Sequence, residues 1–228
     1  SHKRKTMATP SELKAEQALL NTKCVLFNAK KPFVFTSGRI SPVYVDIRRL
    51  IAFPQERNML MGMAAEKLSE LDLDFIAGGE TAGIPYAAFI SERLNKPMLY
   101  VRKKPKGFGR MAQIEGCMDE DGKSVILVED LQTDGGSKKL FIDVLREAGA
   151  KVEHSFVVFH YGIFDQSVQN MKDLGVTLHE LTNWWAVLDV ARENKYFDEE
   201  TLESVEFFLN NPDKWAEKNA HLADTKTA

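Results

Sequence analysis

The sequence predicts an α/β fold built on a mainly parallel sheet with helices on both faces. Segments at 73–94, 125–145 and 152–174 each begin with a short apolar run and continue through a turn into a helical pattern. In the run VILV at 125–128, three of the four residues are β-branched, which is typical of a buried strand. Strands that alternate with helices usually pair in parallel, and such sheets bind ligands at the carboxyl ends of their strands.

Length and composition favour an ordinary globular protein. We expect one domain over residues 1–228, with a flexible tail at 1–10 and a helical appendage at 184–228. The net charge of −3 gives no sign of a nucleic-acid or membrane surface, and no apolar run approaches the roughly 18 residues of a membrane span. The two cysteines suit neither a disulfide framework nor a metal site, so reduced thiols and a cytoplasmic location are expected.

The N-terminal part is expected to alternate helices with short strands. Ser11 can cap a helix whose apolar positions extend to Phe27. After it, the pattern predicts strands at 33–35 and 43–47 and a helix over 54–71.

The chain beyond residue 71 continues the alternation. The predicted strands lie at 75–76, 98–101, 125–128, 152–161 and 176–181. Helices are predicted from near Ile84, from Ser137 to Gly149, at 164–174, and in three segments after Trp184, with Asp198 as the cap of the second of these. We expect the last three to pack on the sheet or to cover the site.

The stretch from Val125 to Ser137 carries the strongest functional signal. Glu129 and Asp130 follow its buried strand, and a short loop with two glycines leads to Ser137, which can cap the next helix. Backbone N–H groups in such a turn, together with the helix N-terminus, attract an anion. The two carboxylates can accept hydrogen bonds from vicinal hydroxyls. The stretch therefore predicts a site for a ribose 5-phosphate, with a purely structural strand, turn and helix as the alternative.

Two further segments are candidates for the same site. Glycines at 78–83 permit close approach of a ligand to the backbone, although tight turns also use glycine for structure alone. The segment 102–116 is basic, contains glycine and is poor in core residues, which predicts an exposed, mobile loop or an ordinary solvated surface. His154, His160 and His179 have no metal-site spacing and are expected to be packing or surface residues. His160 is the exception worth testing, because it ends a strand near the presumed base pocket.

Four motifs resemble those of a known family. EDLQTDGGS, after VILV and before a helix, resembles the signature of type I phosphoribosyltransferases, which binds 5-phosphoribosyl 1-diphosphate (PRPP). Earlier in the chain, FTSGRISPVYVD, GGETAGIP and VRKKPKGFG, in that order and spacing, resemble the orotate phosphoribosyltransferase branch. The resemblance covers about residues 19–161.

This resemblance has several implications. It implies a type I phosphoribosyltransferase fold with an N-terminal hood segment and a helical C-terminal appendage. The implied reaction converts orotate and PRPP to orotidine 5′-monophosphate and diphosphate in de novo pyrimidine (UMP) biosynthesis. It also implies Mg²⁺, bound mainly through PRPP, and a homodimer in which the basic loop reaches the neighbouring subunit's site.

The resemblance also assigns roles to individual residues. Glu129 and Asp130 would hold the ribose hydroxyls, and Lys103 and Asp130 are the implied catalytic residues. The implied PRPP ligands are Thr81, Ala82, Arg102, Lys103, Lys106, Glu129, Asp130, Leu131, Gln132, Thr133, Asp134, Gly135, Gly136 and Ser137. The implied orotate ligands are Tyr44, Val45 and Thr133, and no residue is implied as a direct metal ligand.

Some positions depart from the family pattern in the segments that bind the two substrates. Thr36 stands where many members have a lysine, a contact that Arg39 or Arg48 could supply. Ala82 replaces a lysine often found in the diphosphate-binding turn, and Phe108 replaces a histidine of the basic loop.

The remaining departures affect the base and the phosphate. The arginine expected to bind the orotate carboxylate falls near His160 and Tyr161, and neither matches it. Asp134 fits beside a phosphate only if its side chain turns away or binds water around Mg²⁺. Two alternatives to orotate transfer therefore stay open. One is phosphoribosyl transfer to another base, such as a purine, and the other is a non-catalytic module that senses PRPP.

Overall fold

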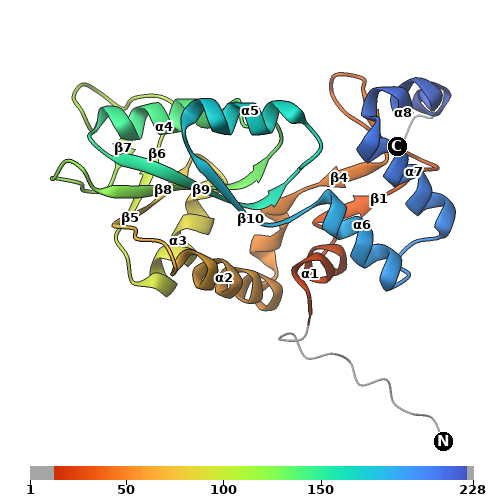
Figure 1. Cartoon of the computed structure of the whole chain (residues 1–228), viewed down its shortest axis with the longest axis horizontal. Coiled ribbons are helices and arrows are strands. Elements are labelled where there is room, and N and C mark those ends of the chain that lie inside the picture. Colours follow the sequence, from red (N-terminus) through yellow and green to blue (C-terminus); the bar gives the residue numbers. More distant parts are fainter. Residues whose placement is uncertain (1–12, 225–228) are drawn as a thin grey trace, which may run out of the picture. The chain divides into compact units, whose positions relative to one another are not determined.

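The computed structural model of the protein describes residues 13–224 (Figure 1). These residues form two compact units, one made of 13–59 with 184–224 and the other of 60–183. The predicted tail at 1–10 and the predicted cap Ser11 lie outside the described residues. The single domain expected over 1–228 stays a prediction.

The unit at 60–183 is built on a six-stranded sheet in the order β10-β9-β8-β5-β6-β7. All neighbouring strands are parallel except β7, which pairs antiparallel with β6. The mainly parallel sheet expected from the sequence is therefore confirmed. Its strands are β5 (Phe75–Gly79), β6 (Met98–Val101), β7 (Ile114–Glu115), β8 (Ser124–Gln132), β9 (Lys151–His160) and β10 (Thr177–Asn183).

Helices cover both faces of this sheet. The chain moves from β5 to β6 in one direction across the sheet, and from β8 through β9 to β10 in the other. Because such crossovers are right-handed, the reversal sends the connecting helices to opposite faces. Accordingly, α2 (Pro54–Leu68) and α3 (Gly83–Leu94) lie on one side of the strands, and α4 (Lys138–Glu147) and α5 (Asp165–Leu174) lie on the other (Figure 1). The reversal falls between β5 and β8, where open sheets of this kind bind ligands.

Strand β8 is longer than its apolar run predicts. Residues 125–128 are fully buried, as expected, but the strand continues to Gln132, so Glu129 and Asp130 lie within it rather than after its end. The extension forms because β9 runs alongside it and pairs with it as far as Gln132 and His160. Ser137 occupies the N-cap position of α4 as predicted, but its side chain makes no capping hydrogen bond within the described chain.

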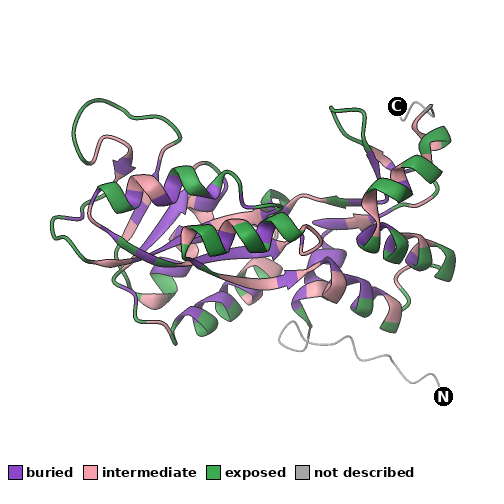
Figure 2. Cartoon of the chain, turned by 45° about the horizontal axis from the view of Figure 1, so that its top comes forward, coloured by how far each residue is buried: buried purple, intermediate pink, exposed green. Residues whose placement is uncertain are grey.

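A hydrophobic core fills the space between α4 and the sheet. Phe141, Ile142 and Leu145 of α4 pack in one buried cluster with strand residues such as Leu99 and Leu127. Figure 2 shows the strands of this sheet largely buried and the loop after β6 exposed. The core thus fixes the strands, while the segments after their carboxyl ends remain accessible.

Glycines let the start of α3 pack directly on β5 and β8. A Cβ atom on Gly83 would lie 2.4 Å from the Val128 carbonyl oxygen, and one on Gly78 would lie 2.7 Å from the Gly83 carbonyl oxygen. Both distances are too short for any side chain. Close packing therefore explains why both positions are glycine, whether or not a ligand binds there.

The other unit brings the two ends of the described chain together. Its N-terminal elements are α1 (Ala15–Asn21), β1 (Val25–Phe27), β2 (Phe33–Val34), β3 (Ile40–Ser41), β4 (Val43–Val45) and the 3-10 helix η2 (Ile47–Ala52). Its C-terminal elements are α6 (Trp184–Glu193), α7 (Glu199–Asn210), α8 (Pro212–Lys218) and the 3-10 helix η3 (Ala220–Asp224). Strand β1 pairs antiparallel with β4, and β2 with β3.

Two N-terminal predictions were wrong. The helix expected to run to Phe27 ends at Asn21, because Lys23 adopts a positive φ of 60° and the following residues pair with β4 instead. The strand expected at 43–47 ends at Val45, and Ile47 begins a 3-10 helix. Both errors concern pairings between distant residues, which local periodicity does not reveal.

The C-terminal helices pack on the N-terminal segment of the same unit. The ring of Phe27 lies 5.8 Å from that of Trp184 and 5.0 Å from that of Phe197. The Tyr196 hydroxyl donates a hydrogen bond of 2.9 Å to Asn21 Oδ1. Asp198 caps α7 as predicted, since its Oδ1 accepts the Thr201 N–H at 2.8 Å. No helix within residues 13–224 is both long and apolar enough to cross a membrane.

The close packing at Gly83 leads to a stability prediction. We expect Gly83→Ala to lower the free energy of unfolding by about 2–3 kcal/mol, because the added methyl group overpacks the contact with Val128. Gly62→Ala is the matched control: Gly62 lies within α2 with open space around its Cα, so alanine should raise stability by about 0.5–1 kcal/mol. Urea unfolding of both variants measures the difference, and equal midpoints would contradict the packing described.

Candidate active site

The carboxyl ends of β5 and β6 are tied together by Glu80. Its backbone N–H donates to the Val101 carbonyl oxygen at 3.0 Å, and its Oε2 accepts the Lys103 N–H at 2.6 Å. The peptide bond between Glu80 and Thr81 is cis. The turn at 80–83 and the first residues of the basic loop, predicted as two parts of one site, are therefore in direct contact.

The same turn lies against the acidic pair of β8. A Cβ atom on Gly83 would lie 3.3 Å from Glu129 Cα, and one on Gly79 would lie 3.4 Å from Glu129 Cγ. Asp130 is the next residue of the strand and is half-buried. Three strand ends thus place the turn, the basic loop and the carboxylates along one edge of the sheet, beside the reversal of strand order.

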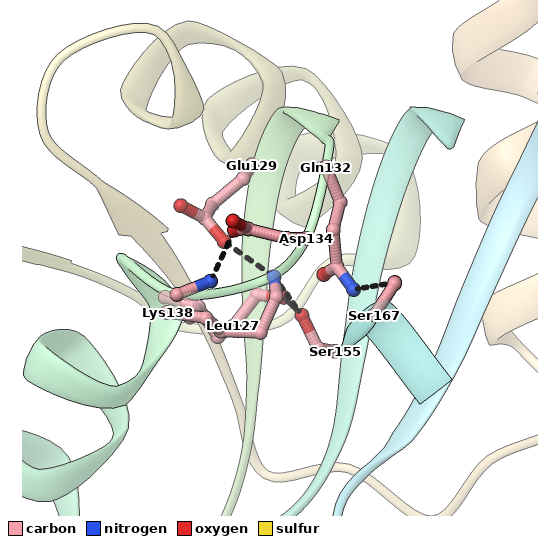
Figure 3. Close-up of polar contacts among 8 residues, drawn as sticks. Leu127, Glu129, Gln132, Asp134, Lys138, Ser155 and Ser167 are labelled. Atoms are coloured by element: carbon pink, nitrogen blue, oxygen red, sulfur yellow. Dashed lines mark hydrogen bonds and ion pairs between the residues drawn. The ribbon is translucent and has the colours of Figure 1, made fainter. Parts of the chain in front are cut away.

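Glu129 is paired with a buried lysine that the sequence analysis did not single out. The Lys138 ammonium donates to Glu129 Oε1 and, at 2.8 Å, to the Ser155 hydroxyl, which in turn donates to the Leu127 carbonyl oxygen at 3.0 Å (Figure 3). The Lys138 side chain is 1% exposed and that of Glu129 is 13% exposed. One carboxylate oxygen is therefore fixed from behind the strand.

The loop after β8 encloses a small pocket. The pocket has a volume of about 80 Å³, enough for several water molecules and hence for a phosphate-sized group. It is lined by Glu129, Leu131, Gln132, Thr133, Gly135, Ser137 and Lys138. Except for Lys138, all of them are among the residues predicted to hold the ribose hydroxyls and the 5-phosphate.

The glycine at the centre of the loop is required by its backbone and its neighbour. Gly135 has a φ of 79°, in the left-handed region that favours glycine. A Cβ atom there would lie 3.0 Å from the Gln132 side-chain nitrogen. The Gln132 amide, which is buried, therefore supports the loop from below.

Asp134 turns toward its own loop. Its Oδ1 accepts the Gly136 N–H at 2.8 Å, and its carbonyl oxygen accepts a hydrogen bond of 2.7 Å from the Asn170 side chain on α5. The carboxylate thus occupies one of the N–H groups that the loop could offer to an anion. It has to release that group if a phosphate is to use it.

A chain of hydrogen bonds connects the loop to β10. Gln132 Nε2 donates to Ser167 Oγ at 2.9 Å, and Ser167 Oγ lies 2.7 Å from His160 Nε2. His160 Nδ1 lies 3.0 Å from Glu180 Oε1, and the Glu180 Oε2 accepts from the Asn183 side chain at 2.9 Å. Both nitrogens of His160 are engaged in this chain, so the histidine supports the loop rather than facing a base.

Tyr161 has a packing role at the position where an arginine was expected. Its backbone N–H donates to the Gln132 carbonyl oxygen at 2.8 Å, and its ring stacks on Phe164 at 5.5 Å. The side chain is largely buried. The position thus stabilises the start of the segment that leads to α5.

The basic loop is held at its base and open at its tip. Gln113 donates through its side chain to the carbonyl oxygens of Arg102 and Lys103, at 2.9 and 3.1 Å. Arg102 and Lys106 lie 3.5 and 3.7 Å from the Glu115 carboxylate. The Lys103 side chain is exposed, and Phe108 at the tip is fully exposed. Arg102, Lys103 and Lys106 therefore come directly after the carboxyl end of β6, at the same edge of the sheet as Glu129.

Comparisons with known proteins agree with this geometry. A family model described as the phosphoribosyl transferase domain matches residues 53–195, more than half of the chain. The orotate phosphoribosyltransferase of Roseobacter denitrificans is 52% identical over 206 residues, which cover 88% of this chain and 91% of the relative. That of Rhizobium rhizogenes is 48% identical over 224 residues, or 96% of each chain.

The chain belongs to the orotate phosphoribosyltransferase family. A solved structure of orotate phosphoribosyltransferase from Aeropyrum pernix is 29% identical and matches 80% of this chain and 99% of its own with a TM-score of 0.65. The fold expected from the resemblance, including the N-terminal and C-terminal parts, is confirmed.

The predicted orotate ligands of this family member lie in both units. Thr133 is exposed in the loop after β8, whereas Tyr44 and Val45 belong to β4 of the other unit. The ring of Tyr44 lies 5.3 Å from that of Phe33. The roles of Tyr44 and Val45 in base binding stay predictions. Arg39, considered as a substitute for the missing lysine, forms an ion pair with Asp213 of α8.

Sequence reasoning missed the residues that support the site from behind. Lys138 could have been found, because it lies at helical spacing with the buried residues Phe141, Ile142 and Leu145. A lysine on such an apolar face requires a buried partner. Ser167 and Glu180 gave no comparable signal. Glu180 reaches His160 through the pairing of β9 with β10, and Ser167 reaches it from α5.

The titration of Glu180 reflects its place in the network. Burial by itself would raise the pKa of this carboxyl group, but hydrogen bonds from His160 and Asn183, and the attraction of His160 and Lys67, lower the pKa overall. A pKa that is lower in the folded state means that the ionised group stabilises the fold. This contribution is present above the unfolded value of about 4.3 and is lost as the pH falls through the folded value.

We therefore expect Glu180→Gln to weaken the pH dependence of stability. The free energy of unfolding of the wild type should fall more steeply between about pH 6 and 3 than that of the variant, because only the wild type must protonate this carboxylate. Glu92→Gln, on the exposed side of α3, controls for the change in net charge. Urea unfolding at a series of pH values measures the slopes, and parallel slopes for wild type and Glu180→Gln would count against the network.

Proposed function

We propose that the protein transfers the phosphoribosyl group from PRPP to orotate, giving orotidine 5′-monophosphate and diphosphate, as a step of de novo pyrimidine (UMP) biosynthesis. The observation that carries this proposal is the meeting of the acidic pair, the phosphate-sized pocket, the turn at 80–83 and the basic loop along one sheet edge. The curated relatives, about half identical over most of the chain, bear the name of this activity.

The proposed roles follow the charge that develops during the reaction. When the bond between the anomeric carbon and diphosphate breaks, the ribose becomes positive and the leaving group negative. Glu129 and Asp130 would hold the ribose hydroxyls beside the developing cation, and the loop at 131–137 would hold the 5-phosphate through its N–H groups. Asp130 would thereby act as a catalytic residue through its charge.

The diphosphate would lie between the turn and the basic loop. Thr81 and Ala82 would contact it from the turn, and Arg102, Lys103 and Lys106 would close on it from the loop. We assign the main catalytic role to Lys103, because its backbone is held by the hydrogen bond to Glu80 while its side chain is exposed. Closing the loop would also exclude water and so suppress hydrolysis of PRPP.

Two further aspects belong to the same proposal. The basic loop would complete the site of a neighbouring subunit in a homodimer. Its tip at Phe108 is exposed, as a loop that reaches another subunit requires. The protein would act in the cytoplasm, where its two free thiols stay reduced. The base would be recognised by Thr133, Tyr44 and Val45.

Mg²⁺ would be bound mainly through PRPP. Within residues 13–224 there is no group of three or more histidine, cysteine or acidic side chains placed to hold a metal, and Glu129 already gives one oxygen to Lys138. This donor set fits a metal carried by the substrate rather than one held directly by the chain. When bound, the ion neutralises charge on the diphosphate.

The test is an assay of purified protein with Mg²⁺, PRPP and a panel of bases. The proposal expects orotidine 5′-monophosphate and diphosphate from orotate, and far slower reaction with purines. A preference for another base would replace orotate in the proposal. No diphosphate from any base, combined with tight PRPP binding, would favour the PRPP-sensing module.

The variant Lys103→Ala separates an enzyme from a sensor. For an enzyme, we expect kcat to fall by about 100-fold or more, since the lost charge acts on the leaving group in the transition state, while the Kd for PRPP changes far less. Lys104→Ala is the matched control, an exposed lysine of the same loop with no assigned role, and should stay close to wild type. A variant whose only defect is weaker PRPP binding would contradict catalysis by Lys103.

A further inference from the structure

Lys138 is a buried cation at the start of α4. Its side chain is 1% exposed, and it lies on the face of the helix that also carries Phe141, Ile142 and Leu145. Removing an ammonium group from water is costly unless charge and hydrogen bonds compensate for it. An apolar side chain at this position would fill the same space without that cost.

The compensation comes from polar groups on β8 and β9. The ammonium donates to Glu129 Oε1 and to Ser155 Oγ, and the Ser155 hydroxyl is itself bound to the Leu127 carbonyl oxygen. Both partners of the ammonium are thus held on rigid strands, β8 and β9. Figure 3 shows the Lys138 side chain reaching these groups from the helix that follows the loop.

The two carboxylate oxygens of Glu129 therefore have different surroundings. Oε1 accepts the ammonium, whereas Oε2 keeps its capacity to accept from a ligand in the pocket that Glu129 and Lys138 both line. A carboxylate fixed by one oxygen presents the other in a defined direction, which favours binding of a hydroxyl group at a set position.

We propose that Lys138 is a positioning residue for the phosphoribosyl substrate, acting through Glu129. The lysine holds the carboxylate in one rotamer by binding Oε1, so that Oε2 receives a ribose hydroxyl without rearrangement. The inference rests on the proposed function, since it takes the ribose of PRPP as the ligand of Glu129. A role in stability alone does not account for the lysine, because buried ion pairs are often replaceable by apolar residues without loss of stability.

The experiment is a double-mutant cycle on PRPP binding. Titration calorimetry with PRPP and Mg²⁺, without any base, is carried out on wild type, Lys138→Met, Glu129→Gln and the double variant. Methionine keeps the length of the lysine stem but lacks its charge. Lys139→Met, which removes the exposed neighbouring lysine of the ion pair with Asp143, is the matched control and should bind PRPP as the wild type does.

The proposal expects a strong dependence on Glu129. Lys138→Met should weaken PRPP binding by about tenfold or more in the wild-type background, and by less than about threefold when Glu129 is already glutamine. Lys138→Arg, which keeps the charge, should recover part of the loss. If Lys138→Met does not fold, as judged by circular dichroism, Lys138→Gln takes its place in the cycle with the same expectation.

Two results would overturn the inference. One is PRPP binding by Lys138→Met within about twofold of wild type. The other is a loss of PRPP affinity on Lys138→Met that is equally large whether residue 129 is glutamate or glutamine, so that the two losses multiply in the double variant. Failure of the proposed function is separate: a wild type that binds PRPP but does not react with orotate would refute the transfer and leave the binding cycle intact.

Discussion

The central position of β8 is the constraint on which the site depends. The strand pairs with β5 on one side and with β9 on the other, and the order of the chain reverses between β5 and β8. Its carboxyl end therefore lies where crossovers diverge to opposite faces, so no helix covers it. Glu129, Asp130 and the loop to Ser137 acquire their accessible position from this pairing, and the turn at 80–83 and the basic loop lie beside them for the same reason.

Buried polar groups then convert this position into a defined geometry. One cluster joins Lys138, Glu129 and Ser155, and the other runs from Gln132 through His160 to Glu180 beside the loop at 131–137. Such clusters add little net stability, because each group loses hydration when it is buried. Their directed hydrogen bonds instead restrict the rotamers of the side chains at the strand end. A packed apolar core would supply no such directed contacts.

The sequence predicted the parts of the site that are local. The strand, acidic pair and glycine loop from Val125 to Ser137 were recognisable because their chemistry lies within one stretch, and the basic loop because its composition differs from that of a core segment. The extension of β8 to Gln132 was missed, because it depends on pairing with β9. Strand β1 was taken for helix for a similar reason, since its partner β4 lies about twenty residues away in the chain.

Supporting residues were harder to predict than contacting ones. Lys138 carried a local signal in its helical spacing, whereas Glu180 lies on a different strand from His160 and their contact follows from the tertiary fold alone. Asp134 was noted as unusual beside a phosphate. The structure gives its side chain a partner, the Gly136 N–H, that no pattern in the sequence indicated.

In the proposed function, one sheet edge, formed by the ends of β5, β6 and β8, binds the phosphoribosyl substrate. Amide hydrogen exchange with and without PRPP and Mg²⁺ tests it most directly, because binding through backbone N–H groups slows their exchange. We expect slower exchange at 131–137 and at 80–83 on addition of PRPP, and little change there on addition of orotate alone. Unchanged exchange at 131–137 in protein that demonstrably binds PRPP would contradict it.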